Sequence, residues 1–265
     1  MAALPRVKKE YQIPRGRLVF YPFDATGKRL GGRQFGNCPS FSLSVEGEKA
    51  PHYSSQGGLR EKDEEILIEV TRKASLTTDN ISGNNLRLFL SGTAETHTQA
   101  TAAVTDEKLT VEPGCIYQLG VTAAAPTGAR KIGAVELKSK DGTTTFDVNA
   151  DFIVDADLGL LQIVEGGAID AATEVQVAYT AAATSWERIK SGSGADLKGA
   201  LQLIADNAHG DNRDWFFPNV SLSPTGELPL IQDGTDYSQI GFDVEVLKPD
   251  NGEAVYVDGR AALIP

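Results

Sequence analysis

The segment from His52 to Gly92, HYSSQGGLREKDEEILIEVTRKASLTTDNISGNNLRLFLSG, decides the fold class of this chain. Its central part, ILIEVTR, places Ile66, Ile68 and Val70 at every second position. A period of two is typical of a β-strand that buries one of its faces. We therefore predict a strand here, with these three side chains directed toward a core.

The stretch that follows, NISGNNLRLFLSG (80–92), predicts a short helix. Either Ser82 or Asp79 can accept the free amide hydrogens at its start, and Gly92 can end it. A helix of this length is not stable alone, so we expect it to pack against the sheet. Its apolar side is predicted to consist of Leu86, Phe89 and Leu90.

The approach to the predicted strand is a charged arm that runs from Glu48 to Glu64 and contains Gly57 and Gly58. This composition is typical of a segment that cannot form a core, so we predict a long arm loop. Loops of this length commonly serve in binding, and we expect this one to contact another subunit. The candidate interface residues are Tyr53, Gly57, Gly58, Leu59, Arg60 and Leu67.

Alternating apolar residues predict strands on both sides of this region, whereas the polar stretch SGTAETHTQATAAVTDE (91–107) predicts a mobile loop. Residues before Gly16 lack a period and predict an extended tail or an added strand. In IGFDVEV (240–246), the apolar residues face one way while Asp243 and Glu245 face the other. That strand therefore has a core side and an acidic side.

Residues 114–184 contain several short strand-like segments, and Asp141-Gly142 is a strong signal for a hairpin turn. We interpret this region as a small inserted β module. The remaining residues, 1–113 and 185–265, are then expected to form one discontinuous domain. The predicted fold class is all-β, with a β-sandwich or barrel-like core and one short packed helix.

The composition limits the possible partners. The chain has 265 residues and a net charge of −11, and a field of that sign repels polyanions and disfavours specific nucleic-acid binding. The N-terminal stretch lacks the apolar part of an export signal, and no apolar run is long enough for a membrane span. No association with a membrane is expected.

Enzymatic chemistry is not predicted. The three histidines lie in polar segments, without a nucleophile and base at a recognisable spacing: His52, His97 and His209. The pair Asp155 and Asp157 lacks the further ligands of a calcium loop. Cys38 and Cys115 are expected to be free thiols. We therefore predict no catalytic, cofactor-binding or metal-binding residue.

Two blocks of the chain resemble the major tail proteins, or tail tube proteins, of tailed bacteriophages, especially of the long-tailed, non-contractile kind. The first block is the segment 52–92. The second comprises GALQLIADNAHGDNRDWFFPNVSLSPTGELPLIQDG (199–234), QIGFDVEVLKP (239–249) and EAVYVDGRA (253–261). The blocks occur in the order that the family has.

This resemblance implies a virion protein that is assembled in the host cytoplasm into stacked, hexameric rings. The rings would form a hollow tail tube around a tape-measure protein, with tail-completion and tail-tip proteins as further partners. DNA would pass through the tube without specific binding. Because carboxylates repel phosphates, we expect some acidic strand residues to line the lumen. The candidates are Glu65, Glu69, Asp243 and Glu245.

The alternative is a surface-binding β module that recognises carbohydrate or a host cell surface. Exposed aromatic rings beside polar groups can bind sugars, and the stretch DWFFP contains Trp215, Phe216 and Phe217. Adjacent aromatics in a strand more commonly divide between core and interface, so we expect these three to serve in packing. The inserted module is the other surface that such a protein could use.

Overall fold

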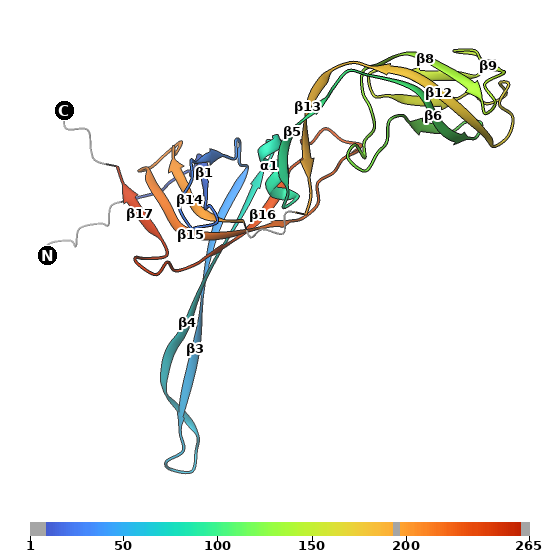
Figure 1. The fold of residues 1–265 in the computed structure, drawn as a ribbon. Helices are drawn as coiled ribbons and strands as arrows, with labels where there is room; N and C mark the ends of the chain where they lie inside the picture. The colour runs from blue at the N-terminus through green and yellow to red at the C-terminus, as the bar shows by residue number, and fades with distance from the viewer. Residues whose placement is uncertain (1–8, 193–196, 261–265) are drawn as a thin grey trace, which may run out of the picture. The chain divides into compact units, whose positions relative to one another are not determined.

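The computed structural model describes residues 9–192 and 197–260, which form two compact units. Unit 1 combines Met1–Ala94 with Ile189–Pro265, and unit 2 is Glu95–Arg188. Residues 1–8 of the predicted N-terminal tail lie outside the described residues, while Ile13 forms an isolated antiparallel bridge with His209. Figure 1 shows the order of the elements along the chain.

The predicted all-β class with one short helix is confirmed, and the strand pairs within the three larger sheets are antiparallel. Unit 1 contains α1 (Gly83–Phe89), β1 (Gly16–Pro22), β2 (Arg33–Gln34), β3 (Ser40–Ser54), β4 (Glu61–Thr78), β14 (Leu197–Ala205), β15 (Arg213–Thr225), β16 (Ile240–Val246) and β17 (Tyr256–Gly259). Unit 2 contains β6 (Ala102–Val111), β7 (Ile116–Gln118), β8 (Ile132–Ser139), β9 (Thr145–Phe146), β10 (Phe152–Asp155), β11 (Leu160–Ile163) and β12 (Thr173–Ala181). The strands β5 (Thr93–Gln99) and β13 (Thr184–Lys190) pair with each other and carry the chain across the boundary.

Unit 1 is built on one sheet with the strand order β2-β1-β14-β15-β16-β4-β3, and β17 adds to β15. Although β3 and β15 are separated by two strands, the rings of Phe41 and Phe217 have centroids 6.0 Å apart. The sheet therefore curls around its core, without closing into a barrel within the described residues. Of the sandwich or barrel-like core expected for this part of the chain, the structure has a single curled sheet that stays open.

The strand β16 has the alternation that its sequence predicts. Phe242 and Val244 are buried, whereas Asp243 and Glu245 are exposed. Phe242 lies at the centre of the core, with its ring 5.7 Å from that of Phe35. The core side and the acidic side of the sheet are thus fixed by this strand.

The helix α1 begins as predicted, because the Ser82 hydroxyl accepts a hydrogen bond from the Asn85 amide at 3.3 Å. The predicted apolar side is wrong in part, since Leu88 is the buried leucine and Leu90 is 43% exposed. The Asn85 side chain is also buried, and its amide donates to the Phe35 carbonyl oxygen at 2.7 Å. A polar residue therefore helps to fix this helix on the sheet.

Unit 2 has a core between two sheets, of order β6-β12-β8-β9 and β10-β11-β7. The predicted alternation of Val175, Val177 and Tyr179 is confirmed, and all three are buried. The Tyr179 hydroxyl donates to the Glu107 carboxylate at 2.7 Å. This bond joins β12 to β6, so β6 belongs to unit 2.

The boundaries of the units therefore differ from the predicted limits at 113/114 and 184/185. The predicted mobile loop over 91–107 is largely strand, comprising β5 and the first half of β6. Its threonines and alanines give no clear apolar period, yet β6 pairs with β12 along its length. Pairing across the chain, rather than local sequence, makes this segment a strand.

We predict that Phe242→Ala lowers the free energy of unfolding of unit 1 by about 3–5 kcal/mol, because the cavity cannot be refilled. Urea unfolding in a Trp186→Phe background, which leaves Trp215 as the reporter in unit 1, measures this change. Leu90→Ala in unit 1 is the control, since Leu90 is 43% exposed. A loss below about 1 kcal/mol for Phe242→Ala would contradict the assigned core position.

Candidate functional site

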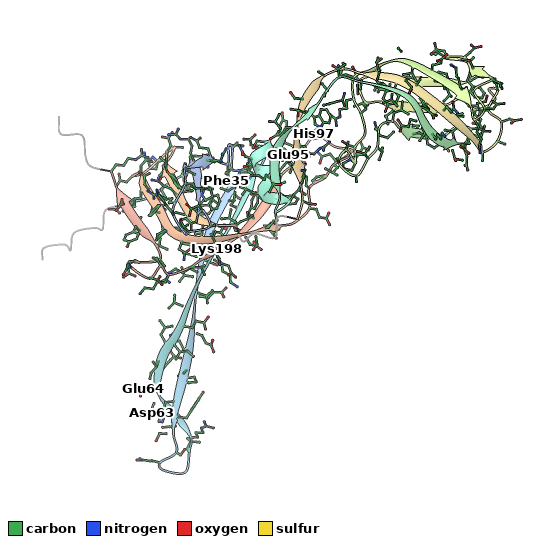
Figure 2. All side chains as sticks on the ribbon, viewed as in Figure 1. Phe35, Asp63, Glu64, Glu95, His97 and Lys198 are labelled. Atoms are coloured by element: carbon green, nitrogen blue, oxygen red, sulfur yellow. The ribbon has the colours of Figure 1, made fainter. Side chains whose placement is uncertain are left out.

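The pairing of β3 with β4 continues far beyond the rest of the sheet. The strand β16 pairs with β4 only between Lys73 and Thr78, whereas β3 pairs with β4 as far as Ser54 and Glu61. Figure 1 shows this hairpin extending away from the sheet of unit 1, and Figure 2 places Asp63 and Glu64 on it, far from Phe35 of the core. A two-stranded ribbon with no further strand beside it is only marginally stable in water.

The predicted arm loop is therefore wrong for most of its length, since residues 48–54 and 61–64 are regular strand. Only residues 55–60 form the tip, where Gly57 and Gly58 have φ angles of +93° and +83°. These left-handed conformations explain the two adjacent glycines. The charges in the arm do not prevent strand formation, because both of its faces are open to water.

The prediction that Ile66, Ile68 and Val70 are buried is also wrong. Their exposed fractions are 55%, 59% and 39%, and Leu67 on the same strand is 54% exposed. The alternation correctly indicates a strand but cannot tell whether another element covers it. In this part of the hairpin, none of the residues that the structure describes covers it.

A β-bulge at Glu48/Lys49 changes which side chains share a face of the hairpin. Directly opposed residues share a face, and residues two apart along β3 do as well. The opposed pairs Val45 with Arg72, Gly47 with Val70 and Lys49 with Leu67 therefore lie on one side. Consistent with this, a Cβ added at Gly47 would lie 2.8 Å from a methyl carbon of Leu67.

This side of the hairpin is the continuation of the core side of the sheet. The next opposed pair along β3 and β4 is Leu43 with Ala74, which packs in the core of unit 1. We call Val45, Leu67 and Val70 the apolar strip. It extends the core side of the sheet onto a ribbon that no described residue covers.

The tip residues predicted as interface candidates lie close together. The Arg60 guanidinium lies over the Tyr53 ring, 4.7 Å from its centroid, and Leu59 beside it is 68% exposed. An apolar and cationic tip with two glycines can adapt to another surface. Leu67 is not at the tip but within the apolar strip.

The four predicted luminal residues do not share one face. Glu65 lies on the side of the apolar strip, where it accepts hydrogen bonds from Lys49 at 2.8 Å and from Lys62. These bonds lower the pKa of Glu65 to about 2. Because both ammonium groups neutralise this carboxylate, Glu65 contributes little repulsion.

The other three candidates share the opposite side, which we call the acidic face. It carries Glu48 directly opposite Glu69, and Asp243 and Glu245 opposite Ser75 and Lys73. Like charges in directly opposed positions destabilise a sheet. The repulsion between Glu48 and Glu69 therefore lowers the stability of the hairpin, while the two carboxylates make this surface negative.

The histidines His52 and His97 make contacts that stabilise the fold and are not part of a catalytic arrangement. The His52 ring nitrogen Nδ1 lies 2.6 Å from the Asp63 carboxylate, and the His97 ring packs 4.8 Å from the ring of Trp186. Among the residues that the structure describes, no group of three His, Cys, Asp or Glu side chains could hold a metal ion. In the same residues, no helix is long and apolar enough to cross a bilayer. Both cysteines are free thiols.

The aromatic stretch DWFFP serves in packing, as predicted. Phe217 is buried in the core, and Trp215 stacks on it with ring centroids 6.4 Å apart. Phe216 is half-buried and lies beside Arg29. These rings do not form an open platform for a sugar.

The family described as protein of unknown function UCP028589 matches residues 11–254 of the chain. No curated protein matches it. The matched range contains unit 2, the whole hairpin and every strand of unit 1 except β17.

We predict that the Glu65 carboxyl titrates with a midpoint near 2 rather than at its ordinary value of 4.5. Because the folded-state pKa is the lower one, the contacts of Glu65 stabilise the hairpin above pH 4.5 and are lost as the pH falls toward 2. Carbon-detected NMR of the side-chain carboxyl measures the midpoint. In Lys49→Met and Lys62→Met variants it should rise, and an unchanged midpoint in both would refute the assigned cause.

Proposed function

The chain belongs to the family described as protein of unknown function UCP028589, and for this member we propose a structural role in the tail tube of a long-tailed bacteriophage. In this proposal, copies of the chain associate into rings, by resemblance hexameric, and the rings stack into a conduit for DNA. The protein is then a component of the virion and has no catalytic site.

The observation that carries this proposal is the apolar strip on the uncovered hairpin. Apolar side chains on both strands, together with two unpaired strand edges, form a surface that promotes association. A second copy of the chain offers matching edges, and a closed ring of copies leaves no edge exposed. Self-association would therefore cover the apolar strip and pair the free strand edges of the hairpin.

The placement of the two tail-tube-like blocks supports the tail tube over other self-associating proteins. Segment 52–92 contains part of β3, β4 and α1, and the blocks within 199–261 contain most of β14 and all of β15 to β17. All of these elements belong to unit 1. Unit 1 is accordingly the tube-forming part in this proposal, and unit 2 is an addition to it.

The acidic face provides the proposed lining of the tube. Carboxylates at Glu69, Asp243 and Glu245 would repel DNA phosphates and leave no strong binding site along the path. Glu65 is not part of this lining, because two lysines neutralise it. A tape-measure protein inside the tube and tail-completion and tail-tip proteins at its ends remain proposed partners from the resemblance.

A surface-binding role is the second candidate, and one feature of unit 2 favours it. The half-buried ring of Trp186 has Arg130 and Arg188 within 4.5 Å and 5.6 Å of its centroid. An aromatic ring beside cations can bind an acidic sugar. This candidate requires no self-association, so the state of the purified protein distinguishes the two.

We predict that the purified protein forms rings and tubes visible by negative-stain electron microscopy. The double variant Leu67→Ser/Val70→Ser should remain folded, because both side chains are exposed, but should stay monomeric. The matched control is Ile116→Ser/Ile153→Ser in unit 2, where both residues are also exposed. Globular wild-type particles with affinity for glycans would favour the second candidate. Normal tubes from the hairpin variant would reject the role of the strip.

We predict that Asp243→Lys/Glu245→Lys tubes retain short duplex DNA on sedimentation, whereas wild-type tubes leave the DNA in the supernatant. The retention should weaken as salt is raised, because it depends on phosphate contacts. The control is the same charge change at exposed positions of unit 2, Glu165→Lys/Asp170→Lys. Equal retention of DNA by both variants would argue against a luminal position of the acidic face.

A further inference from the structure

The connection between β15 and β16, residues 226–239, exposes the most solvent-accessible large apolar side chains of the described residues. The exposed fractions of Leu230, Ile231 and Tyr237 are 87%, 97% and 85%. Antiparallel neighbours are usually joined by only a few residues, and a much longer connection is commonly functional. We call this segment the apolar loop.

The apolar loop is held to unit 1 by its own contacts, and all of its charged residues are acidic. Leu228 packs against the core of unit 1, and the Gln232 side chain donates to the Asp236 carbonyl oxygen. The sequence GELPLIQDGTDYSQ contains Glu227, Asp233 and Asp236 but no lysine or arginine. The loop therefore presents exposed apolar side chains among negative charges. Because its own contacts already restrict its conformation, less conformational entropy is lost when it binds.

Unit 1 also has a groove whose lining is apolar and positively charged, which complements the apolar, acidic loop. Its volume is about 740 Å³, and the side chains that line it include Leu18, Phe41, Leu203 and Trp215. The same groove is lined by Arg15, Arg17 and Arg213, all exposed, with Asp206 as the one acidic residue in the lining. Arg213 also forms an ion pair with Glu10 at 3.6 Å, which a docking carboxylate would have to share. In a chain with a net charge of −11, three arginines around an apolar floor mark a site for an acidic, apolar segment.

The loop and the groove belong to opposite ends of β15. The groove takes Arg213 and Trp215 from the first residues of this strand, and the loop follows its last residue, Thr225. A strand of this length spans roughly 40 Å. A contact between the loop of one copy and the groove of another is therefore heterologous, and such contacts repeat from copy to copy.

We propose that the apolar loop of one copy binds the groove of the next, inserting Leu230 and Ile231 while Asp233 and Asp236 meet the arginines. The inference rests on the proposed self-association and adds a head-to-tail contact that is separate from the apolar strip. The hairpin is the poorer occupant of this groove, because Arg60 is the one charged residue of its tip, 55–60, and the seven acidic residues of 45–70 lie outside that tip. Its tip would bring Arg60 close to the arginines of the groove.

A charge exchange tests this contact in the full-length chain. The loop variant is Asp233→Lys/Asp236→Lys, and the groove variant is Arg17→Glu/Arg213→Glu. Each alone places like charges across the interface and should reduce the fraction of protein in tubes by about tenfold or more. The chain that carries all four substitutions restores opposite charges and should recover to within about twofold of the wild type.

Sedimentation and negative-stain microscopy measure the assembled fraction, and circular dichroism confirms that each variant is folded. Glu165→Lys/Asp170→Lys is the matched control for the loop variant and should assemble normally. If the wild type itself does not assemble, the proposed function fails and this inference fails with it. If the wild type assembles and either variant does so equally well, or the fourfold variant does not recover, only the loop-and-groove contact is rejected.

Discussion

The register of β3 against β4 is the constraint on which the functional surfaces depend. Opposed pairs from Leu43 with Ala74 to Lys49 with Leu67 place Leu43, Val45, Val70 and Leu67 on one side of the ladder, from the core of unit 1 into the free hairpin. The same register gathers Glu48 and Glu69 on the other side, next to the acidic residues of β16. A ladder shifted by one residue would exchange the two sides and mix carboxylates into the apolar strip.

Local patterns predict the elements that are stabilised by their own neighbours. The alternation in β16 and β12 is visible in the sequence because one side of each strand is fully buried. The start of α1 is predictable because Ser82 caps it through a contact only three residues away. The all-β class and most strands of unit 2 follow from such signals, which involve few residues and no distant partner.

The candidate site is less predictable, because its features depend on residues far apart in the chain. The period of Ile66, Ile68 and Val70 is that of a half-buried strand, yet no described residue covers them. The bulge inserts Ile68 of β4 opposite Glu48/Lys49, in a stretch of β4 without glycine or proline to signal it, and it separates Glu65 from the other three acidic candidates. The exposed apolar loop at 226–239 has no period at all, so only its burial in the folded chain distinguishes Leu228 from Leu230.

The pairing of β5 with β13 has a consequence for how such a chain can change during evolution. The polypeptide leaves unit 1 along β5 and returns along β13, so the two crossing points are adjacent strands of one short ribbon. A hairpin of a few residues could replace everything between them without breaking a hydrogen bond of the large sheet. Recombination could therefore exchange this cassette for an unrelated domain while the scaffold of unit 1 stays the same.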